Sequence, residues 1–390
     1  MSNNYTGLRH FAKSDEKAAK RCAERLLKMR EALGPIRARK SDRTLLVATW
    51  NIRDFDSNKF KFGPRLEESF YYIAEIISCF DLVAVQEVNR DLSALEKTMR
   101  ILGREWDYIV TDATEGSGGN EERMAFVYNT EKVWFRKVAG EVVLPDGQLI
   151  ISRKKLTKKE GKAVEAPDEA ETEAAARAGF KEVRQQFSRT PFLVAFQSGW
   201  FKFSLCTVHI YFGDDRGEKL ERRVKEIEAL VKFFAKRQNR ESKDEKKSGR
   251  LPENYILLGD FNVVSPEHET MQALKAEGFT VPKEIDGDQV RDEDDHFYDQ
   301  IAVRVKDERF QVSDGGIVDM FAAVFRDDPE DLEIYKKFMP KKDPENGARA
   351  AKDVEAFYRK WRTWQMSDHA PLWVEIATDF TEHYLKQFVD

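Results

Sequence analysis

Short apolar runs bounded by polar residues recur along the chain and predict β-strands. They lie at Leu45–Ala48, Leu82–Val85, Phe203–Val208, Tyr255–Leu258 and Leu372–Ile376. Two longer segments, Leu66–Ser78 and Leu220–Ala235, repeat apolar residues at helical spacing and predict amphipathic helices. Strands paired in sheets and covered by such helices predict an α+β layered sandwich.

The N-terminal segment has a helical pattern and a strong positive charge. A helix is expected over Ser14–Leu33, with Ser14 as its N-cap and Gly34-Pro35 ending it. Residues 1–43 contain 12 Lys and Arg against 5 Asp and Glu, a net charge of +7. The whole chain carries −5, so the remainder carries −12. This basic helical extension is either a solvated packing appendage or an arm that recruits a polyanion.

Polar patches lie beside the five apolar runs, at positions where the predicted strands end or begin. They are Thr49-Trp50-Asn51, Gln86-Glu87, Thr207-Val208-His209, Gly259-Asp260-Phe261-Asn262 and Ser367-Asp368-His369. One such patch alone is ordinarily a strand meeting a turn, because Asn and Asp side chains hydrogen-bond their own backbone there. Together the patches supply the oxygen ligands that Mg²⁺ prefers in proteins. The pattern therefore favours a divalent metal site at the strand ends.

In this order along the chain, the patches resemble the motifs of the endonuclease/exonuclease/phosphatase superfamily, whose members cleave phosphoester bonds with Mg²⁺ or Mn²⁺. The resemblance runs from about Thr44 to about Ile376. It implies a four-layered α/β sandwich, with two central mixed β-sheets packed face to face and helices outside. It also implies one catalytic domain over residues 44–380, between the 1–43 extension and a C-terminal tail at 381–390.

Three charged insertions are expected within that domain, near residues 152–182, 236–250 and 326–365. The segment Ser152–Glu182 lacks strand-like alternation and is expected to be an inserted helix or a loop. The segment Lys236–Arg250 is expected to be a charged connector that faces solvent.

The resemblance also assigns roles to individual residues. The metal ligands that it implies are Glu87, Asn51, Asp368 and Asp260. The catalytic residues that it implies are the imidazoles of His209 and His369, their orienting carboxylates Glu122 and Asp299, and the pair Asp260 and Asn262. That pair would bind the nucleophile, a second metal or the substrate phosphate.

Within the superfamily, two histidines resemble the deoxyribonuclease I-like branch rather than the exonuclease III-like one. The segment Ser188-Arg189-Thr190-Pro191-Phe192 resembles a deoxyribonuclease I segment whose Arg contacts substrate phosphate, which implies substrate binding by Arg189. Two positions depart from the pattern, because Asn89 and Gln300 stand where arginines are usual. These departures leave the identity of the substrate open.

Basic and aromatic residues alternate in the segment Phe357–Trp364, just before the Ser-Asp-His patch. Such a segment suits a phosphodiester backbone and stacked bases, which makes Arg359, Arg362 and Trp364 candidate substrate-binding residues. A helix that packs Phe357, Trp361 and Trp364 against the core explains the same pattern equally well.

The resulting functional hypothesis is a Mg²⁺-dependent endonuclease whose partner is nucleic acid, DNA in the first place. The alternatives are a phosphatase or phosphodiesterase for a small ester, such as an inositol phosphate or lipid head group, and a non-catalytic scaffold. Three cysteines, no signal-peptide pattern and no 18-residue apolar stretch predict a cytoplasmic protein without a membrane span.

Overall fold

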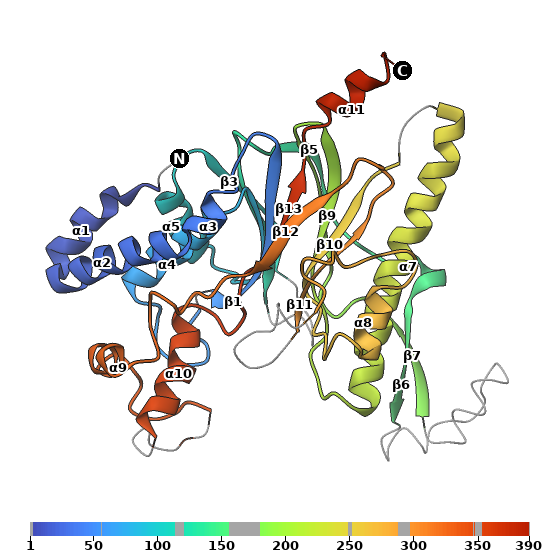
Figure 1. Cartoon of the computed structure of the whole chain (residues 1–390). Coiled ribbons are helices and arrows are strands. Elements are labelled where there is room, and N and C mark those ends of the chain that lie inside the picture. The colour runs from blue at the N-terminus through green and yellow to red at the C-terminus, as the bar shows by residue number, and fades with distance from the viewer. Residues whose placement is uncertain are drawn as a thin grey trace.

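Two β-sheets face each other in the centre of the molecule, and helices cover their outer faces (Figure 1). The computed structural model describes residues 3–55, 57–113, 121–155, 180–248, 252–287, 297–345, 347 and 353–389. The order of layers is helix, sheet, sheet, helix, as the sequence motifs imply. The predicted α+β sandwich with two central mixed sheets is therefore confirmed.

The first sheet has six strands in the order β12-β13-β1-β2-β4-β3. Their bounds are β1 Thr44–Phe55, β2 Leu82–Val88, β3 Trp106–Val110, β4 Arg123–Asn129, β12 Val312–Ile317 and β13 Leu372–Ala377. The sheet is mixed, because β1 pairs parallel with β2 and antiparallel with β13. Alternate residues of β1 enter different cores: Leu45 and Val47 face the second sheet, whereas Leu46 and Ala48 face the helices.

The second sheet has five strands in the order β11-β10-β9-β8-β5. Their bounds are β5 Trp134–Glu141, β8 Phe192–Ser198, β9 Phe201–His209, β10 Tyr255–Asp260 and β11 Asp299–Arg304. It is mixed as well, with β10 parallel to β9 and antiparallel to β11. All five apolar runs singled out in the sequence form strands. Four of these strands extend into their polar patch, and β13 begins three residues after His369.

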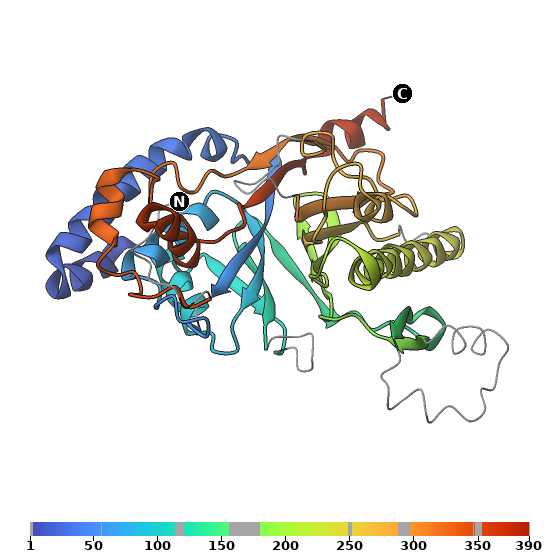
Figure 2. The ribbon, with the colours of Figure 1, turned by 90° about the horizontal axis from the view of Figure 1, so that it is seen from below.

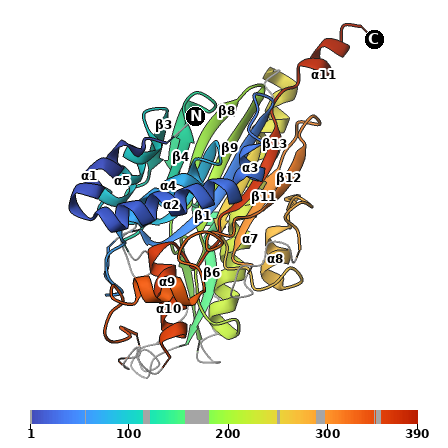
Figure 3. The ribbon, with the colours of Figure 1, turned by 60° about the vertical axis from the view of Figure 1, so that its left-hand side comes forward.

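Helices lie on both outer faces (Figures 1 and 3). On the first sheet's side are α1 Leu8–Ser14, α2 Glu16–Ala32, α3 Gly34–Arg37, α4 Glu67–Ile77, α5 Ser93–Leu102, α9 Pro329–Tyr335 and α10 Val354–Gln365. On the other side are α7 Gly217–Ser248 and α8 Glu269–Leu274. The remaining elements are α11 Thr381–Lys386 and the short 3-10 helices η1 Tyr5–Gly7 and η2 Asp146–Gln148. The predicted helices at residues 66–78 and 220–235 correspond to α4 and to the first half of α7.

The N-terminal segment is an integral layer of the fold rather than a solvated arm. Its apolar side chains Cys22, Leu26 and Met29 belong to the core between helices and first sheet. Its arginines pair with buried carboxylates of the catalytic body, including Glu68, Glu75 and Asp331. The charge of +7 is thus largely matched by neighbouring acids. One detail of the prediction is wrong, since Asp15 caps α2 by accepting from the Ala18 amide, and Ser14 ends α1.

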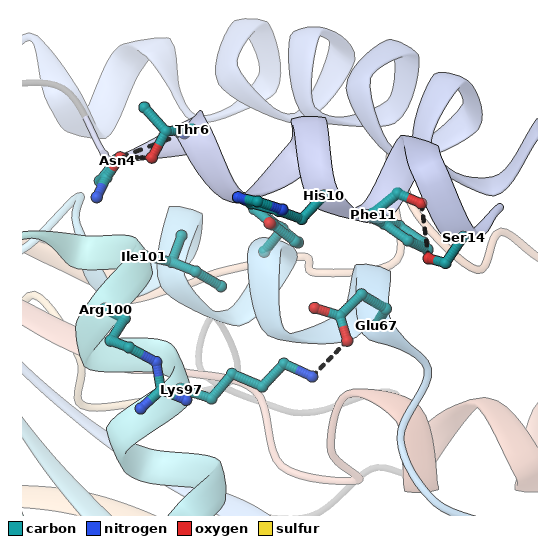
Figure 4. A pocket seen from close by; sticks show the side chains of 11 residues that line it. Asn4, Thr6, His10, Phe11, Ser14, Glu67, Lys97, Arg100 and Ile101 are labelled. Carbon is teal, nitrogen blue, oxygen red and sulfur yellow. Dashed lines mark hydrogen bonds and ion pairs between the residues drawn. The ribbon is translucent and has the colours of Figure 1, made fainter. Parts of the chain in front are cut away.

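A hollow of about 560 Å³ separates α1 from α4 and α5 (Figure 4). His10, Arg100 and Ile101 line it, and Lys97 contacts Glu67 across it at 2.5 Å. The chain passes close to α4 at Gly7, where a Cβ atom would lie 2.5 Å from the Tyr71 hydroxyl.

Two of the three expected insertions contain more regular structure than predicted. The ends of the 152–182 segment belong to the antiparallel hairpin of β6 Ile150–Lys155 and β7 Phe180–Gln185, which projects from the sandwich (Figure 2). Residues 156–179 lie outside the described residues. Residues 236–248 are not a connector but the second half of α7, and Gln238 is buried there.

All three cysteines are buried and unpaired. Burial raises the pKa of the Cys79 thiol to about 11. Within the described ranges, none of the helices combines the length and the apolar character that a membrane span requires.

The buried carboxylate of Glu75 fastens the N-terminal segment, and its removal should destabilise the fold. It accepts from Asn3 and Arg30, both at 3.0 Å, and also contacts Tyr5 and Arg37. Glu75→Ala leaves these donors without their buried carboxylate partner. We therefore expect a loss of about 3 kcal/mol in the free energy of unfolding, measured with urea.

The matched control is Glu221→Ala, which removes an exposed helical pair with Lys225. That change should cost less than about 0.5 kcal/mol. Equal, small losses in both variants would mean that apolar contacts alone hold the segment.

Candidate active site

The polar strand ends of both sheets meet at one edge of the sandwich. The first sheet contributes Asn51 from β1, Glu87 from β2, and the residues that precede β13. In the second sheet, Asp260 at the end of β10 is in register with His209 on β9 and with Asp299 on β11. Residues as far apart in sequence as Asn51 and His369 therefore come together at one place.

Amide side chains connect the two sheets at this edge. Asn51 Nδ2 donates to Glu87 Oε1 at 3.1 Å and to Asp260 Oδ2 at 3.2 Å, so one amide joins carboxylates of opposite sheets. Deeper in the core, Gln86 Nε2 donates to the Thr207 hydroxyl of β9 at 2.7 Å. Both amides are buried.

The two imidazoles converge on one carboxylate oxygen. His209 Nδ1 lies 3.1 Å from Glu122 Oε2, and its Nε2 lies 3.5 Å from Asp260 Oδ2. His369 Nδ1 lies 2.6 Å from Asp299 Oδ2, and its Nε2 lies 3.9 Å from the same oxygen of Asp260. Each histidine thus has one nitrogen beside an orienting carboxylate and directs the other toward Asp260.

The pKa values at the site diverge because like and unlike charges are crowded together. Burial raises the pKa of Glu87, and the carboxylates of Glu122 and Asp368 add to this effect. Burial also opposes ionisation of Glu122, but contacts with His209 and Arg189 outweigh it and hold that pKa at about 2. Burial alone would lower the pKa of His369, yet Asp299 raises it well above its usual value.

Backbone strain is concentrated at the same strand ends. Glu87 and Asn262 have φ values of 58° and 51°, in the left-handed region that non-glycine residues avoid. Gly259 has φ 136°, and a Cβ atom there would lie 2.2 Å from the Val208 carbonyl oxygen. Asn262 is held by bonds from its own amide to Asp260 Oδ1 and from its side chain to the Ile210 carbonyl, both at 2.9 Å.

The Ser-Asp-His patch is fixed to β1 by its serine. Ser367 Oγ donates to the Asn51 carbonyl at 2.6 Å and accepts from the backbone amides of Arg53 and His369. The Arg53 side chain pairs with Asp368 at 3.1 Å. Sequence reasoning missed Arg53, although strand alternation puts it on the same side of β1 as Asn51.

Arg189 lies at the site but faces a carboxylate. Its Nε is 3.1 Å from Glu122 Oε2, and its side chain is only 9% exposed. Lys59 approaches the other oxygen of Glu122 at 4.0 Å. In this arrangement Arg189 pairs with Glu122, the carboxylate that faces His209, and helps to lower its pKa.

The candidate substrate residues of α10 have different surroundings. Arg359 is half exposed and pairs with Asp327 at 3.3 Å. Arg362 is buried, donates to the Phe325 carbonyl and lies 4.1 Å from the Phe321 ring centroid. Trp364 is buried too, stacked on Phe62 at 4.5 Å. For these two residues the surroundings favour the alternative that the helix packs on the core.

A cleft of about 850 Å³ nevertheless runs from α10 to the strand ends. Its lining includes Arg53, Arg359, Lys360, Arg362 and Asp368. The same space is therefore bordered by basic side chains and by Asp368, one of the predicted metal ligands.

The strand-end oxygens fit a divalent cation. Asn51 Oδ1 is buried and has no hydrogen-bond partner among the residues that the structure describes. Glu87 is a half-buried carboxylate crowded by other carboxylates, whose mutual repulsion a cation would relieve. The described part of the chain also holds a tight acidic trio, Asp328, Glu330 and Asp331. All three pair with Arg326, at 2.7 to 2.9 Å, and Asp331 also pairs with Arg25, so arginines already occupy the trio and offset part of its charge.

No family model matches the chain, and no curated protein matches its sequence. Solved structures do resemble it. A humanized TDP2 of D. rerio has a TM-score of 0.47 at 11% identity, covering 87% of this chain and 100% of that one. An endonuclease/exonuclease/phosphatase family protein from Bacteroides thetaiotaomicron has a TM-score of 0.46 at 18% identity, covering 87% of this chain and 96% of that one.

A mannosyl-6-phosphatase from Bacteroides thetaiotaomicron VPI-5482 has a TM-score of 0.45 at 16% identity, covering 85% of this chain and 99% of that one. At these identities and TM-scores, the similarity does not extend to substrate or reaction, which depend on the site's own residues.

Replacing Asp299 should change the titration of His369. Because the Asp299 carboxylate outweighs burial, Asp299→Asn should lower the pKa of His369, as measured by NMR titration of the metal-free protein. A raised folded-state pKa stabilises the fold fully below about pH 6.5, and this contribution is lost as pH rises through that folded-state pKa. The stability difference between wild type and variant should therefore be largest below about pH 6.5.

The control is Asp286→Asn, which removes a carboxylate that pairs with the exposed Lys275. It should leave the His369 titration as it is. If the pKa of His369 stays raised in Asp299→Asn, then Asp260 and Asp368 raise it rather than Asp299.

Proposed function

We propose that this protein is a Mg²⁺- or Mn²⁺-dependent phosphodiester hydrolase, and specifically an endonuclease that acts on DNA. The observation that carries the proposal is the convergence of two carboxylate-backed imidazoles on Asp260, opposite the oxygens of Asn51 and Glu87. Phosphodiester hydrolysis needs a proton acceptor for water, cationic donors to the phosphoryl oxygens and neutralisation of developing negative charge. The site offers groups for each need.

Glu87, Asn51, Asp368 and Asp260 would hold the cation. Such an ion would polarise the phosphoryl group and neutralise its charge. The Asp299 carboxylate raises the pKa of His369 and so favours its protonated form, whose Nε2 would donate to a phosphoryl oxygen. Asp260 Oδ2 would accept a proton from the attacking water or orient it, and Asn262 would position the phosphate. His209, held by Glu122, would serve as the second donor or as proton acceptor.

Nucleic acid is the proposed substrate because basic groups border the cleft beside Asp368. Arg53, Arg359 and Lys360 all line that space. Arg189 would act through Glu122 and reach phosphate only after that pair opens. Three unpaired cysteines support a cytoplasmic location.

A substrate panel tests the proposal. Purified protein is incubated with supercoiled plasmid, single-stranded DNA, RNA and an inositol polyphosphate, in Mg²⁺ or Mn²⁺ and with chelator. Metal-dependent cleavage of DNA is the expected result. Hydrolysis of the inositol polyphosphate alone would favour the small-ester alternative, and inactivity on all four would favour a scaffold.

Glu87→Gln should separate metal binding from folding. Without metal, the variant should be at least as thermally stable as wild type, because a buried carboxylate with a raised pKa disfavours the folded state at neutral pH. Its hydrolytic rate should fall by at least about 10²-fold, and Mg²⁺ or Mn²⁺ should no longer raise its melting temperature. The matched control is Glu330→Gln in the acidic trio, which should retain the metal-induced rise.

Arg359→Ala and Arg362→Ala should behave differently because only Arg359 is exposed. Losing one phosphate contact at Arg359 should reduce the slope of log affinity for DNA against log salt by about 0.9. Arg362→Ala should keep the slope and lower the melting temperature, since its guanidinium is buried against Phe321 and Phe325. An unchanged slope in both variants would remove α10 from the DNA-binding surface.

A further inference from the structure

Two exposed phenylalanine rings border the candidate active site, one from each sheet. Phe60 follows β1 and is 46% exposed, and Phe212 follows β9 and is 59% exposed. Other exposed aromatic residues lie elsewhere: Trp134 and Trp200 at the opposite end of the second sheet, Tyr384 on α11, and Phe388 just beyond the end of that helix. Neither Phe60 nor Phe212 has a role in the chemistry described so far.

Phe60 stands at the tip of a tight turn beside Glu122. The turn is closed by hydrogen bonds from the Lys61 amide to the Asn58 carbonyl and from the Gly63 amide to the Asn58 side chain. Its ring lies 5.0 Å from that of Trp364, which supports it from α10. The adjacent Lys59 ammonium is 5.1 Å from the ring and 4.0 Å from Glu122 Oε1.

Phe212 has a comparable position on the histidine side of the site. It is three residues beyond His209 and meets Tyr298 edge to face, with ring centroids 6.3 Å apart. Tyr298 in turn lies 5.8 Å from the His369 ring and precedes Asp299. The Arg223 guanidinium is 6.0 Å from the Phe212 ring.

Both rings are thus supported by other aromatic rings and expose surface to solvent. Lys59 is a partly exposed cation beside Phe60, whereas Arg223 beside Phe212 is buried and donates to Asp215 and to backbone carbonyls. Aromatic surface beside cations is the arrangement that stacks unpaired bases while basic groups follow the phosphates. Bases in a duplex already stack on one another, so an exposed ring gains little from them unless they unpair. The loop of Phe60 reaches the site at Glu122 through Lys59, and Phe212 reaches it at His369 through Tyr298.

On the basis of the proposed function, we propose that Phe60 and Phe212 stack unpaired bases on the two sides of the cleaved phosphate. Single-stranded nucleic acid, or an unpaired stretch within a duplex, is then the preferred substrate. DNA and RNA share this stacking chemistry, so the ring contacts do not distinguish them.

Binding measurements with conservative substitutions test this proposal. Fluorescence anisotropy in chelator, which prevents hydrolysis, gives affinities for oligo-dT, oligo-rU and a duplex of the same length. Phe60→Leu and Phe212→Leu keep apolar bulk but lose the aromatic face. Each should weaken binding of the single strands at least about 5-fold, with a smaller effect on the duplex. Phe60→Trp should preserve single-strand affinity, because an indole stacks as well as a benzene ring.

Phe388→Leu is the matched control, since Phe388 is an exposed ring just after α11. It should bind every probe like wild type. Equal losses for single strand and duplex, or no loss in either Leu variant at wild-type melting temperature, would overturn the stacking proposal. Wild-type cleavage of plasmid alongside such a result would leave the proposed hydrolase function standing, whereas inactivity on all substrates would refute that function separately.

Discussion

The active site depends on one cross-sheet contact, in which the Asn51 amide lies between carboxylates of opposite sheets. Glu87 and Asp260 would repel each other if nothing separated them, and Asn51 Nδ2 donates to both. Gln86 makes a similar connection to Thr207 deeper in the core. Because buried polar groups need partners, these amides fix how the two sheets approach each other. The positions of both imidazoles then follow from the strands of the second sheet.

The sequence predicts this arrangement well where the signal is local. Each strand end carries its polar residue next to an apolar run, and pairing of neighbouring strands brings His209, Asp260 and Asp299 into one row. The residues that connect separate motifs leave no comparable signal. Lys59 and Arg189 meet at Glu122 from loops 130 residues apart in sequence, and Ser367 reaches the Asn51 carbonyl. Such contacts exist only once the sheets have closed.

The net charge of a segment also does not show whether that segment packs on the fold. The +7 of residues 1–43 is compatible with a free basic arm and with a packed layer, because the count says nothing about partners. The layer forms because Glu68 and Glu75 on α4, and Asp331 far along the chain from them, are buried where the arginines of α2 and α3 reach them. The pattern of α10 is ambiguous for the same reason. Trp364 is buried because Phe62, some 300 residues earlier, stacks on it.

The division between strands and loops also separates reaction from recognition. The groups proposed to bind a cation or move protons lie at or next to strand ends, where strand pairing restrains them, and the strained φ of Glu87 persists there. Phe60, Phe212 and Arg359 lie on loops or on an inserted helix, where substitution disturbs the sheets little. A change of substrate therefore requires only changes in these surrounding segments, while the crowded carboxylates can be altered only together. For this reason the strand-end motifs bear on the proposed reaction class, and the aromatic loops bear on the proposed substrate.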